Sequence, residues 1–385
     1  MAYRNLIGAG LRTWLNVFVL SLAFVVIIWH KGMLDGWDAQ AKTDLTAWEF
    51  AGGQYWQENY DPYDLFSLDE SHAKIPDEVS TLINEGKMFP VLITQGTIYP
   101  EGRVQSIKIK GIDIHQEIVE LPTNLLQTDD DELLAIIGSN MAKNNKLKAG
   151  DYVTLRWRDV NGTFDATDIM IAGVFKTNAP SVDMGQVWIS INKLQEMMQM
   201  PGEATLFVQQ NKKMETLNIS GWDFKDHAFL FKEMDEMIKM KSVGGSIFWF
   251  ILILLAMLAI FDTQILSIFR RQKEIGTYVA MGMTKRQVVG LFTVEGAFHS
   301  VLAVILGAIY GIPFFIWQSR SGIKFPIEGQ DVGLPMAEIM YPKYGAGLVI
   351  TTVAVVFIIT VIVSYWPSRK IAKMKPTEAL RGKIQ

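Results

Sequence analysis

Three ionisable side chains interrupt long apolar stretches of the sequence and are the first candidates for chemistry. Glu295 and His299 lie four residues apart in one stretch, and Asp262 lies in another. On a helix, Glu295 and His299 would share one face and could relay a proton or operate a gate. The alternative is a structural role, in which these groups form hydrogen bonds between helices.

The depth of Glu295 favours the structural role. An ionisable group costs roughly 2.5–3.5 kcal/mol at the centre of a membrane helix, so it should face protein or water. Glu295 lies seven residues after Val288, where the stretch begins, and this is about 10 Å along a helix. The cost falls towards the membrane surface, so we expect interhelical hydrogen bonding there.

A short basic segment, 273–287, separates two apolar stretches and has the sequence KEIGTYVAMGMTKRQ. Ile275 and Val279 recur at helical spacing, and Gly276 and Ala280 form a small face that allows close approach to another surface. A helix of this kind could dock into a groove on a cytoplasmic partner. It could equally lie on anionic lipid, and the residues alone leave both interpretations open.

A third pattern concerns helix packing. Gly307 and Gly311 form a GxxxG motif inside an apolar stretch, and Pro313 follows two residues later. GxxxG lets two helix backbones approach closely, and the proline indicates a kink.

Composition and motifs exclude several classes of protein. The 385-residue chain contains no Cys, so disulfides and thiolate chemistry are excluded. It contains neither a P-loop motif nor a pair of His residues at metal-binding spacing, so we expect no nucleotide, metal or catalytic residue on this chain. The formal net charge is -4, so no basic field indicates binding to nucleic acid.

The apolar residues are clustered into four stretches. The sequence is 49% hydrophobic and only 20% charged. A membrane helix needs about 20 apolar residues. Three of the stretches supply them, and the first does so if its helix begins near Thr13, so four buried helices in a soluble protein are disfavoured. The first stretch could also be a cleaved signal peptide, but His30 to Asp35 offer no small-residue cleavage site, which favours an uncleaved anchor.

Charge sets the expected orientation. The two ends and the segment 270–287 together carry 13 basic and 2 acidic residues, whereas 31–243 carries 20 basic and 33 acidic residues. Because positive flanks stay on the cytoplasmic side, we expect both termini and 270–287 inside and the acidic insert outside. The predicted order is a cytoplasmic amphipathic helix 1–14, span 15–31, an outside domain 32–243, span 244–269, a cytoplasmic segment 270–287, span 288–317, an outside loop 318–343, span 344–366 and a cytoplasmic tail 367–385.

The outside insert is predicted to be an α+β domain. Alternating apolar residues predict strands at 103–112, 152–157 and 205–209, and Asn161-Gly162 predicts a hairpin to a strand at 163–175. Helices are predicted at 129–147 and 192–200.

The basic segment resembles the signature of the FtsX-like family of type VII ABC transporter permeases. Members have roughly E-I-[GA]-x-x-[RKY]-A-[MIL]-G-[AM]-[ST]-x-x-[QD], and the tail motifs PSRKIA at 367–372 and KPTEALR at 375–381 resemble the end of the family pattern. The order of one span, a large outside domain and three further spans is also similar. The residues that fit the signature are Glu274, Ile275, Gly276, Ala280, Met281, Gly282, Thr284 and Gln287, and Lys285 and Arg286 lie within it.

The resemblance implies that a separate cytoplasmic ATPase dimer, carrying ATP and Mg²⁺, grips 273–287 and the N-terminal helix. It also implies a second permease copy or a paralogue, a location in the inner membrane, and contact with membrane lipid and with a periplasmic lipoprotein or acceptor protein. This chain would be a transporter subunit rather than an enzyme.

The outside domain and the chain's start suggest a branch of the family. Features such as LKAGD at 147–151 and GVFKT at 173–177 look most like lipoprotein-releasing permeases. Macrolide- or peptide-exporting members of the family usually carry an ATPase domain ahead of the first span, and this sequence has none there, which favours the lipoprotein-releasing branch. Drug or peptide efflux and regulation of a cell-wall hydrolase remain the alternatives.

Overall fold

The computed structural model describes residues 11–128, 131–324 and 339–373. Within these residues the chain forms two compact units. The helical unit comprises the described residues of Met1–Trp37, Met237–Lys324 and Ile339–Gln385. The sheet unit comprises the described residues of Asp38–Glu236. Two helices, α2 (Leu11–Leu45) and α8 (Lys232–Arg270), contribute residues to both units.

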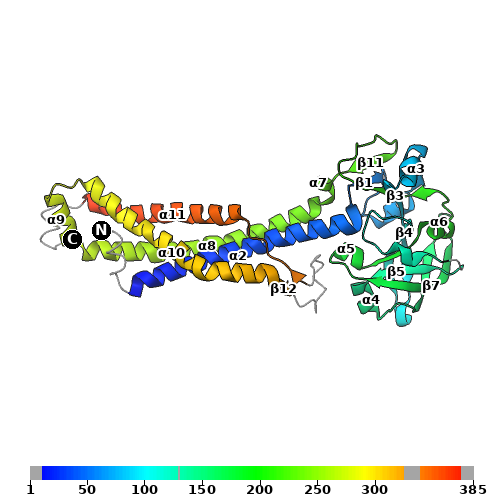
Figure 1. Cartoon of the computed structure of the whole chain (residues 1–385), viewed down its shortest axis with the longest axis horizontal. Helices are drawn as coiled ribbons and strands as arrows, with labels where there is room; N and C mark the ends of the chain where they lie inside the picture. The colour runs from blue at the N-terminus through cyan, green and yellow to red at the C-terminus, as the bar shows by residue number, and fades with distance from the viewer. Residues whose placement is uncertain (1–10, 129–130, 325–338, 374–385) are drawn as a thin grey trace. The chain divides into compact units, whose positions relative to one another are not determined.

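Four long helices build the helical unit (Figure 1). These are α2, α8, α10 (Lys285–Ser321) and α11 (Ala346–Lys373), and each is long and apolar enough to cross a membrane. The short helix α9 (Gln272–Ala280) lies between α8 and α10, and the strands β12 (Ile323–Lys324) and β13 (Ile339–Met340) form an antiparallel pair. The predicted spans 15–31, 244–269 and 288–317 fall inside α2, α8 and α10, and the predicted span 344–366 begins two residues before α11.

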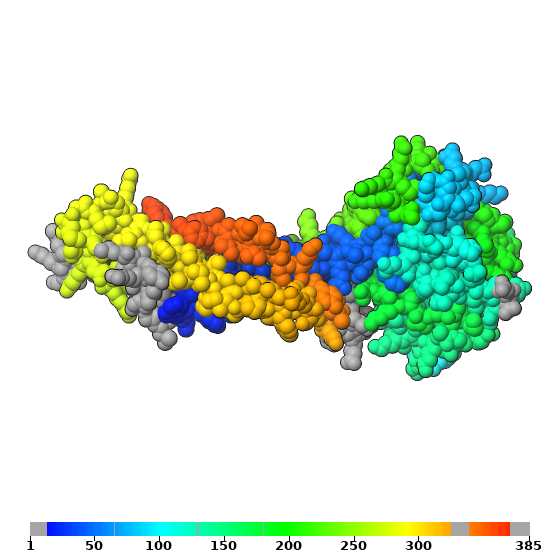
Figure 2. Space-filling model, in the orientation of Figure 1, coloured from blue at the N-terminus to red at the C-terminus, as the bar shows by residue number. Residues whose placement is uncertain are grey.

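The four helices share one buried core. Val17 and Phe24 of α2, Ala256 of α8, Ala303 of α10 and Val356 of α11 are all nearly inaccessible. In Figure 2 the yellow-to-orange atoms of α10 and the redder atoms of α11 lie side by side. Many outward side chains are also apolar, and a helix that is apolar all round is typical of a membrane span.

The sheet unit contains a nine-stranded sheet with short helices around it. Its elements in chain order are the π-helix η1 (Thr46–Phe50), β1 (Gln54–Gln57), η2 (Leu65–Asp69), β2 (Ala73–Lys74), α3 (Asp77–Asn84), β3 (Met88–Ile98), η3 (Pro100–Gly102), β4 (Gln105–Ile112), η4 (Thr123–Leu126), β5 (Leu134–Gly138), α4 (Ser139–Asn145), β6 (Tyr152–Arg158), β7 (Phe164–Phe175), α5 (Pro180–Asp183), β8 (Gln186–Ser190), α6 (Ile191–Met198), β9 (Glu203–Ala204), β10 (Leu206–Gln209), β11 (Trp222–Lys225) and α7 (His227–Leu230).

Six of the strands close into a ring. The sheet order is β11-β1-β10-β3-β4-β8-β5-β7-β6, and β6 pairs again with β3. The pairs β4–β8 and β5–β7 are parallel, and the other pairs in the ring are antiparallel. Closure removes the exposed edges that these six strands would otherwise present.

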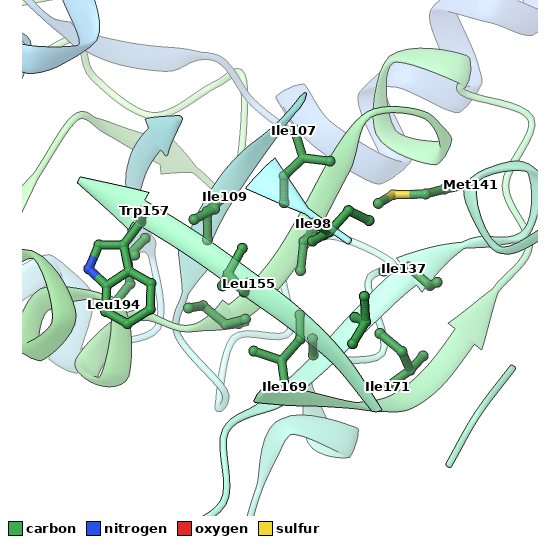
Figure 3. Packing of buried hydrophobic residues seen from close by; sticks show 14 of the residues in the cluster. Ile98, Ile107, Ile109, Ile137, Met141, Leu155, Trp157, Ile169, Ile171 and Leu194 are labelled. Atoms are coloured by element: carbon green, nitrogen blue, oxygen red, sulfur yellow. The ribbon is translucent and has the colours of Figure 1, made fainter. Parts of the chain in front are cut away.

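The inside of the ring is filled by branched apolar side chains. Figure 3 shows Ile98, Ile109, Ile137, Leu155 and Ile169 directed into a common space from five different strands. Each of these side chains is completely buried. The alternation along β6, buried at Val153, Leu155 and Trp157 and exposed between them, has the period expected of a strand with one face inward.

The structure confirms the predicted hairpin and corrects one helix. β6 and β7 pair antiparallel from Tyr152↔Met170 to Arg158↔Phe164, with Asn161-Gly162 in the connecting loop. The prediction of one helix over 129–147 is wrong, because the structure has β5 followed by the short helix α4. All five residues of β5 are buried, and a short strand buried on both faces shows no alternation to distinguish it from a helix.

The α+β domain between the first and second of four membrane helices is confirmed as the architecture of the chain. Several finer expectations fall wholly or partly outside the described residues. These are the N-terminal amphipathic helix 1–14, most of the outside loop 318–343 and the tail motif at 375–381.

Candidate functional site

The candidate site is α9 together with the turn that connects it to α10, and local backbone chemistry defines both ends of that turn. Gly282 has φ +101°, a conformation that side-chain-bearing residues rarely adopt. Its N–H donates to the Val279 carbonyl at 3.1 Å, and the Met283 N–H donates to the Tyr278 carbonyl at 3.0 Å. These two bonds form a Schellman motif, which explains why α9 ends with a glycine.

The next helix begins immediately with a capping box. The Thr284 hydroxyl accepts from the Gln287 N–H at 3.3 Å, and the Gln287 side-chain oxygen accepts from the Thr284 N–H at 2.8 Å. Together they satisfy two N–H groups that the first turn of α10 would otherwise leave unpaired. The signature residues Gly282, Thr284 and Gln287 therefore form a helix stop and a helix start.

Replacing Gly282 by Ala should loosen this turn. A left-handed conformation costs an ordinary L-residue about 1–2 kcal/mol, which corresponds to about 5–30-fold faster amide exchange if the turn opens locally. Hydrogen exchange of the Met283 amide in the full chain measures the effect. Gly282→Asn should cost less, because Asn tolerates this conformation. Equal exchange in the wild type and Gly282→Ala would contradict the strain argument.

One side of α9 is buried against the neighbouring helices. Ile275 is 2% exposed and packs with Ile268 of α8 and Val288, Val289 and Phe292 of α10. Gly276 is also buried. The small face predicted for Gly276 and Ala280 is therefore divided, with Gly276 inside this core and Ala280 exposed.

The other side of the segment is open. Met281 is 69% exposed, although apolar side chains of its size are usually buried in soluble regions. The other exposed residues of the signature segment include Glu274, Ala280, Gly282, Thr284, Lys285, Arg286 and Gln287. The result is a short surface of small, apolar and charged groups on a helix whose opposite side is fixed to the helical unit.

Arg271 joins this segment to α10, and sequence reasoning did not single it out. Its Nη1 lies 3.0 and 2.9 Å from the two carboxylate oxygens of Glu295, and its Nε donates to Glu274 at 2.7 Å. Its guanidinium also lies 4.9 Å from the ring centre of Phe292. The available signal was a basic residue at the end of one span and a buried acid in the next, which must find a counter-charge.

The intramembrane candidates do not form one cluster. Glu295 and His299 are buried on α10, but Asp262 is exposed on α8. Glu295 pairs with Arg271, whereas His299 Nδ1 lies 3.2 Å from the backbone carbonyls of Glu295 and Gly296. His299 Nε2 is buried and has no hydrogen-bond partner among the described residues.

The GxxxG motif packs α10 against α2 of the same chain. An added Cβ at Gly307 would lie 3.5 Å from the Ser21 carbonyl, an ordinary contact, and one at Gly311 would lie 2.9 Å from Val25. Tyr310, between the two glycines, has its hydroxyl 3.1 Å from that of Ser21.

A tighter contact involves Gly296, which sequence reasoning missed. A Cβ there would lie 2.2 Å from the Ser364 hydroxyl oxygen and 2.8 Å from the Gln264 side-chain nitrogen. At Gly296, α10 therefore approaches both α11 and α8 too closely to leave room for a side chain. The only sequence signal was a glycine one residue after Glu295, without a second glycine four residues away.

In the sheet unit, the end of α2 is anchored by a buried ion pair. Lys110 Nζ on β4 lies 2.8 Å from Glu49 Oε1 on η1, with 8% and 14% of the two side chains exposed. The first turn of α8 is joined to α2 nearby, where Lys42 pairs with Asp235 at 2.6 Å. Phe50 and Phe231 add an edge-to-face contact with ring centres 5.6 Å apart.

Metal binding has no support in the part of the chain that the structure describes. Those residues contain no group of three or more His, Asp or Glu side chains placed to hold an ion.

Comparison with a family model points to the same part of the chain. Residues 246–376 match the family model for the FtsX-like permease C-terminal domain. The chain is 23% identical over 273 residues to an uncharacterized ABC transporter permease of Methanocaldococcus jannaschii, covering 66% of this chain and 63% of the relative. It is 21% identical over 237 residues to the lipoprotein-releasing system transmembrane protein LolC of Xylella fastidiosa, covering 55% and 54%.

A further relative is the macrolide export ATP-binding/permease protein MacB of Sodalis glossinidius, which is 27% identical over 154 residues, covering 38% of this chain and 21% of the relative. The chain spans less than two-thirds of the length of each of these three relatives. The matched family region contains α9, the Schellman turn and the capping box. Residues 246–376 thus match the C-terminal domain of FtsX-like permeases, and the four membrane helices with a sheet domain between the first and second are consistent with the architecture of that family.

Proposed function

We propose that this chain is the permease subunit of an ABC transporter that releases lipoproteins from the inner membrane for transport to the outer membrane. A separate cytoplasmic ATPase dimer would bind ATP and Mg²⁺ and dock on the exposed side of 273–287. The observation that carries the proposal is the two-sided character of α9 and its turn, with Ile275 buried in the helical unit and Met281 open. The FtsX-like match over the same residues supports it.

In this proposal the chain transmits movement and performs no chemistry. Closure of the ATPase dimer would push α9, and the spans would pass that movement to the sheet unit on the other side of the membrane. The anchorage of α2 to β4 by Glu49 and Lys110 supports this role, because a buried ion pair resists displacement of the helix end from the sheet. A second permease copy or a paralogue would complete the assembly.

The proposed orientation follows from the charge distribution. Both termini and 270–287 would be cytoplasmic, and the acidic sheet unit would lie in the periplasm, where it could meet a lipoprotein or an acceptor protein. The membrane is proposed to be the inner membrane of a cell with two membranes.

The name of the Xylella relative supports lipoproteins as the cargo. The match to a macrolide exporter supports drug efflux as a second candidate function. Reconstituted release of a lipoprotein to a soluble acceptor, compared with drug resistance in cells, separates the two.

A single charged substitution in the exposed side of 273–287 tests whether the ATPase docks there. Met281→Asp should weaken binding of the cognate ABC ATPase subunit by about tenfold or more, because a carboxylate would be buried in the contact. The binding constant in detergent and ATP-dependent lipoprotein release from vesicles are the two measurements.

Met240→Asp is the matched control. Met240 is 73% exposed, against 69% for Met281, and lies on α8 near the predicted outer end of that helix. It should leave ATPase binding unchanged. Equal loss in both variants, or unchanged binding in Met281→Asp, would overturn this docking site.

A further inference from the structure

The connection between α8 and α9 is a single non-helical residue. α8 ends at Arg270 and α9 begins at Gln272, while Arg271 has φ -104° and ψ 20°. Its carbonyl accepts from the Ile275 N–H at 3.0 Å, so Arg271 is the N-cap of α9. The direction of the chain can change at this residue without breaking either helix.

The side chain of this residue reaches two elements at once. The pair with Glu295 on α10 is largely shielded, since 16% of the Arg271 and 9% of the Glu295 side chain are exposed. The pair with Glu274 on α9 has an outward partner that is 55% exposed. The ring of Phe292, also on α10, covers one face of the Arg271 guanidinium.

These two pairs differ in what they hold in place. An exposed ion pair contributes little, so the Glu274 contact is the weaker one. A shielded carboxylate that loses its counter-charge is strongly unfavourable, so Glu295 keeps Arg271 at α10. The apolar core shared by Ile275 and Phe292 holds the side of α9 against α10, and the Arg271–Glu295 pair holds the N-cap of α9 there.

We propose that Arg271 is a positioning residue that transmits movement of the docking segment to the third span, α10, through its ion pair with Glu295. The inference rests on the proposed ATPase docking and adds the route by which the movement enters the membrane. Without the pair, α9 would keep its docking surface and its apolar contacts with α10, but Arg271 would no longer be held to Glu295, so less of the movement of α9 would reach α10.

The experiment separates docking from transmission. The chain has no Cys, so Trp317→Cys, at an exposed position near the far end of α10, accepts one environment-sensitive fluorophore without background labelling. The labelled full chain is reconstituted with its ATPase, and ATPase affinity, ATP hydrolysis and the fluorescence change on adding ATP and vanadate are recorded. Arg271→Gln should bind the ATPase with an affinity within about twofold of wild type. Its fluorescence change on adding ATP and vanadate should be at least about fivefold smaller than that of wild type.

Three further variants define the pair. Glu295→Gln should reproduce the loss, and Arg271→Gln with Glu295→Gln should be no worse than either alone, as expected of two residues acting together. Arg271→Lys keeps a charge beside Glu295 and should retain more of the signal than Gln. Glu101→Gln is the control, because it removes the carboxylate of an exposed ion pair with Lys146 that lies outside the docking segment, and it should leave the signal near wild type.

The outcomes are distinguishable. An unchanged fluorescence change in Arg271→Gln would overturn this inference alone, as would a parallel loss of ATPase affinity, which would make Arg271 part of the docking surface. If Arg271→Gln fails to fold, Arg271→Met with Glu295→Leu removes both charges, and a full signal from that pair would also overturn it. A wild-type chain that binds no ATPase would overturn the proposed function first, and this inference with it.

Discussion

Replacing Glu49 by Gln should destabilise the sheet unit by about 3–5 kcal/mol, which is the usual cost of leaving one charge of a buried pair without its partner. Lys110 would keep its ammonium group at an 8% exposed position, with the Trp188 ring at 4.7 Å and no carboxylate beside it. Ser181 also donates to Glu49, at 3.1 Å, and would lose a charged acceptor. Hydrogen exchange of the β4 and β8 amides in the full chain measures the loss.

An exposed pair of the same types is the control. Glu101 and Lys146 lie 3.2 Å apart with 53% and 62% of their side chains exposed. Glu101→Gln should therefore change stability by less than about 1 kcal/mol. Replacing both buried partners, Glu49→Leu with Lys110→Met, should recover much of the loss, since apolar substitutes for a buried pair are often neutral. Similar losses from Glu49→Gln and Glu101→Gln would refute this account of the anchorage.

The second large effect is expected at Gly296. Changing it to Ala places a methyl group 2.2 and 2.4 Å from the Oγ and Cβ of Ser364. The hydroxyl can rotate away, but the Cβ is fixed to the backbone of α11, so the two helices must separate. Overpacking of this kind typically costs about 1–3 kcal/mol. The thermal unfolding midpoint of the purified chain should fall accordingly.

Two companion variants make this test specific. Gly290 lies on the same helix with no other described atom within 4 Å of an added Cβ, so Gly290→Ala should be neutral or slightly stabilising. Adding Ser364→Gly to Gly296→Ala removes the opposing side chain and should restore part of the lost stability. No recovery in that double variant would mean that the contact with Ser364 is not the cause.

The ion pair of Glu295 with Arg271 supports the structural role that the depth of Glu295 in the span favours. Sequence reasoning weighed a proton relay against hydrogen bonding between helices. The structure places its carboxylate on Arg271, while Asp262 is exposed on α8 and pairs with neither Glu295 nor His299. Through this pair the Glu295 carboxylate connects α10 to the start of α9. The fluorescence experiment with Arg271→Gln and Glu295→Gln measures that role.

The sequence by itself determined the features that depend on neighbouring residues. Four long apolar stretches define four membrane helices, because a helix in lipid must satisfy its backbone internally. Alternating residues and an Asn-Gly turn define the β6–β7 hairpin. The glycine stop and threonine start around 282–287 lie within six residues, so the turn between α9 and α10 is a local property of the chain.

Only the tertiary structure decided which distant residues meet. Arg271 and Glu295 are 24 positions apart, and Lys110 and Glu49 are 61 apart, so neither pair is expressed in any local period. The strand β5 resembled part of a helix until its pairing with β7 and β8 was known. Gly296 is an isolated glycine in the sequence, and its importance arises because Ser364, from another helix, occupies the space a side chain would need. Contacts of this kind depend on how helices and strands pack, which spacing along one element does not specify.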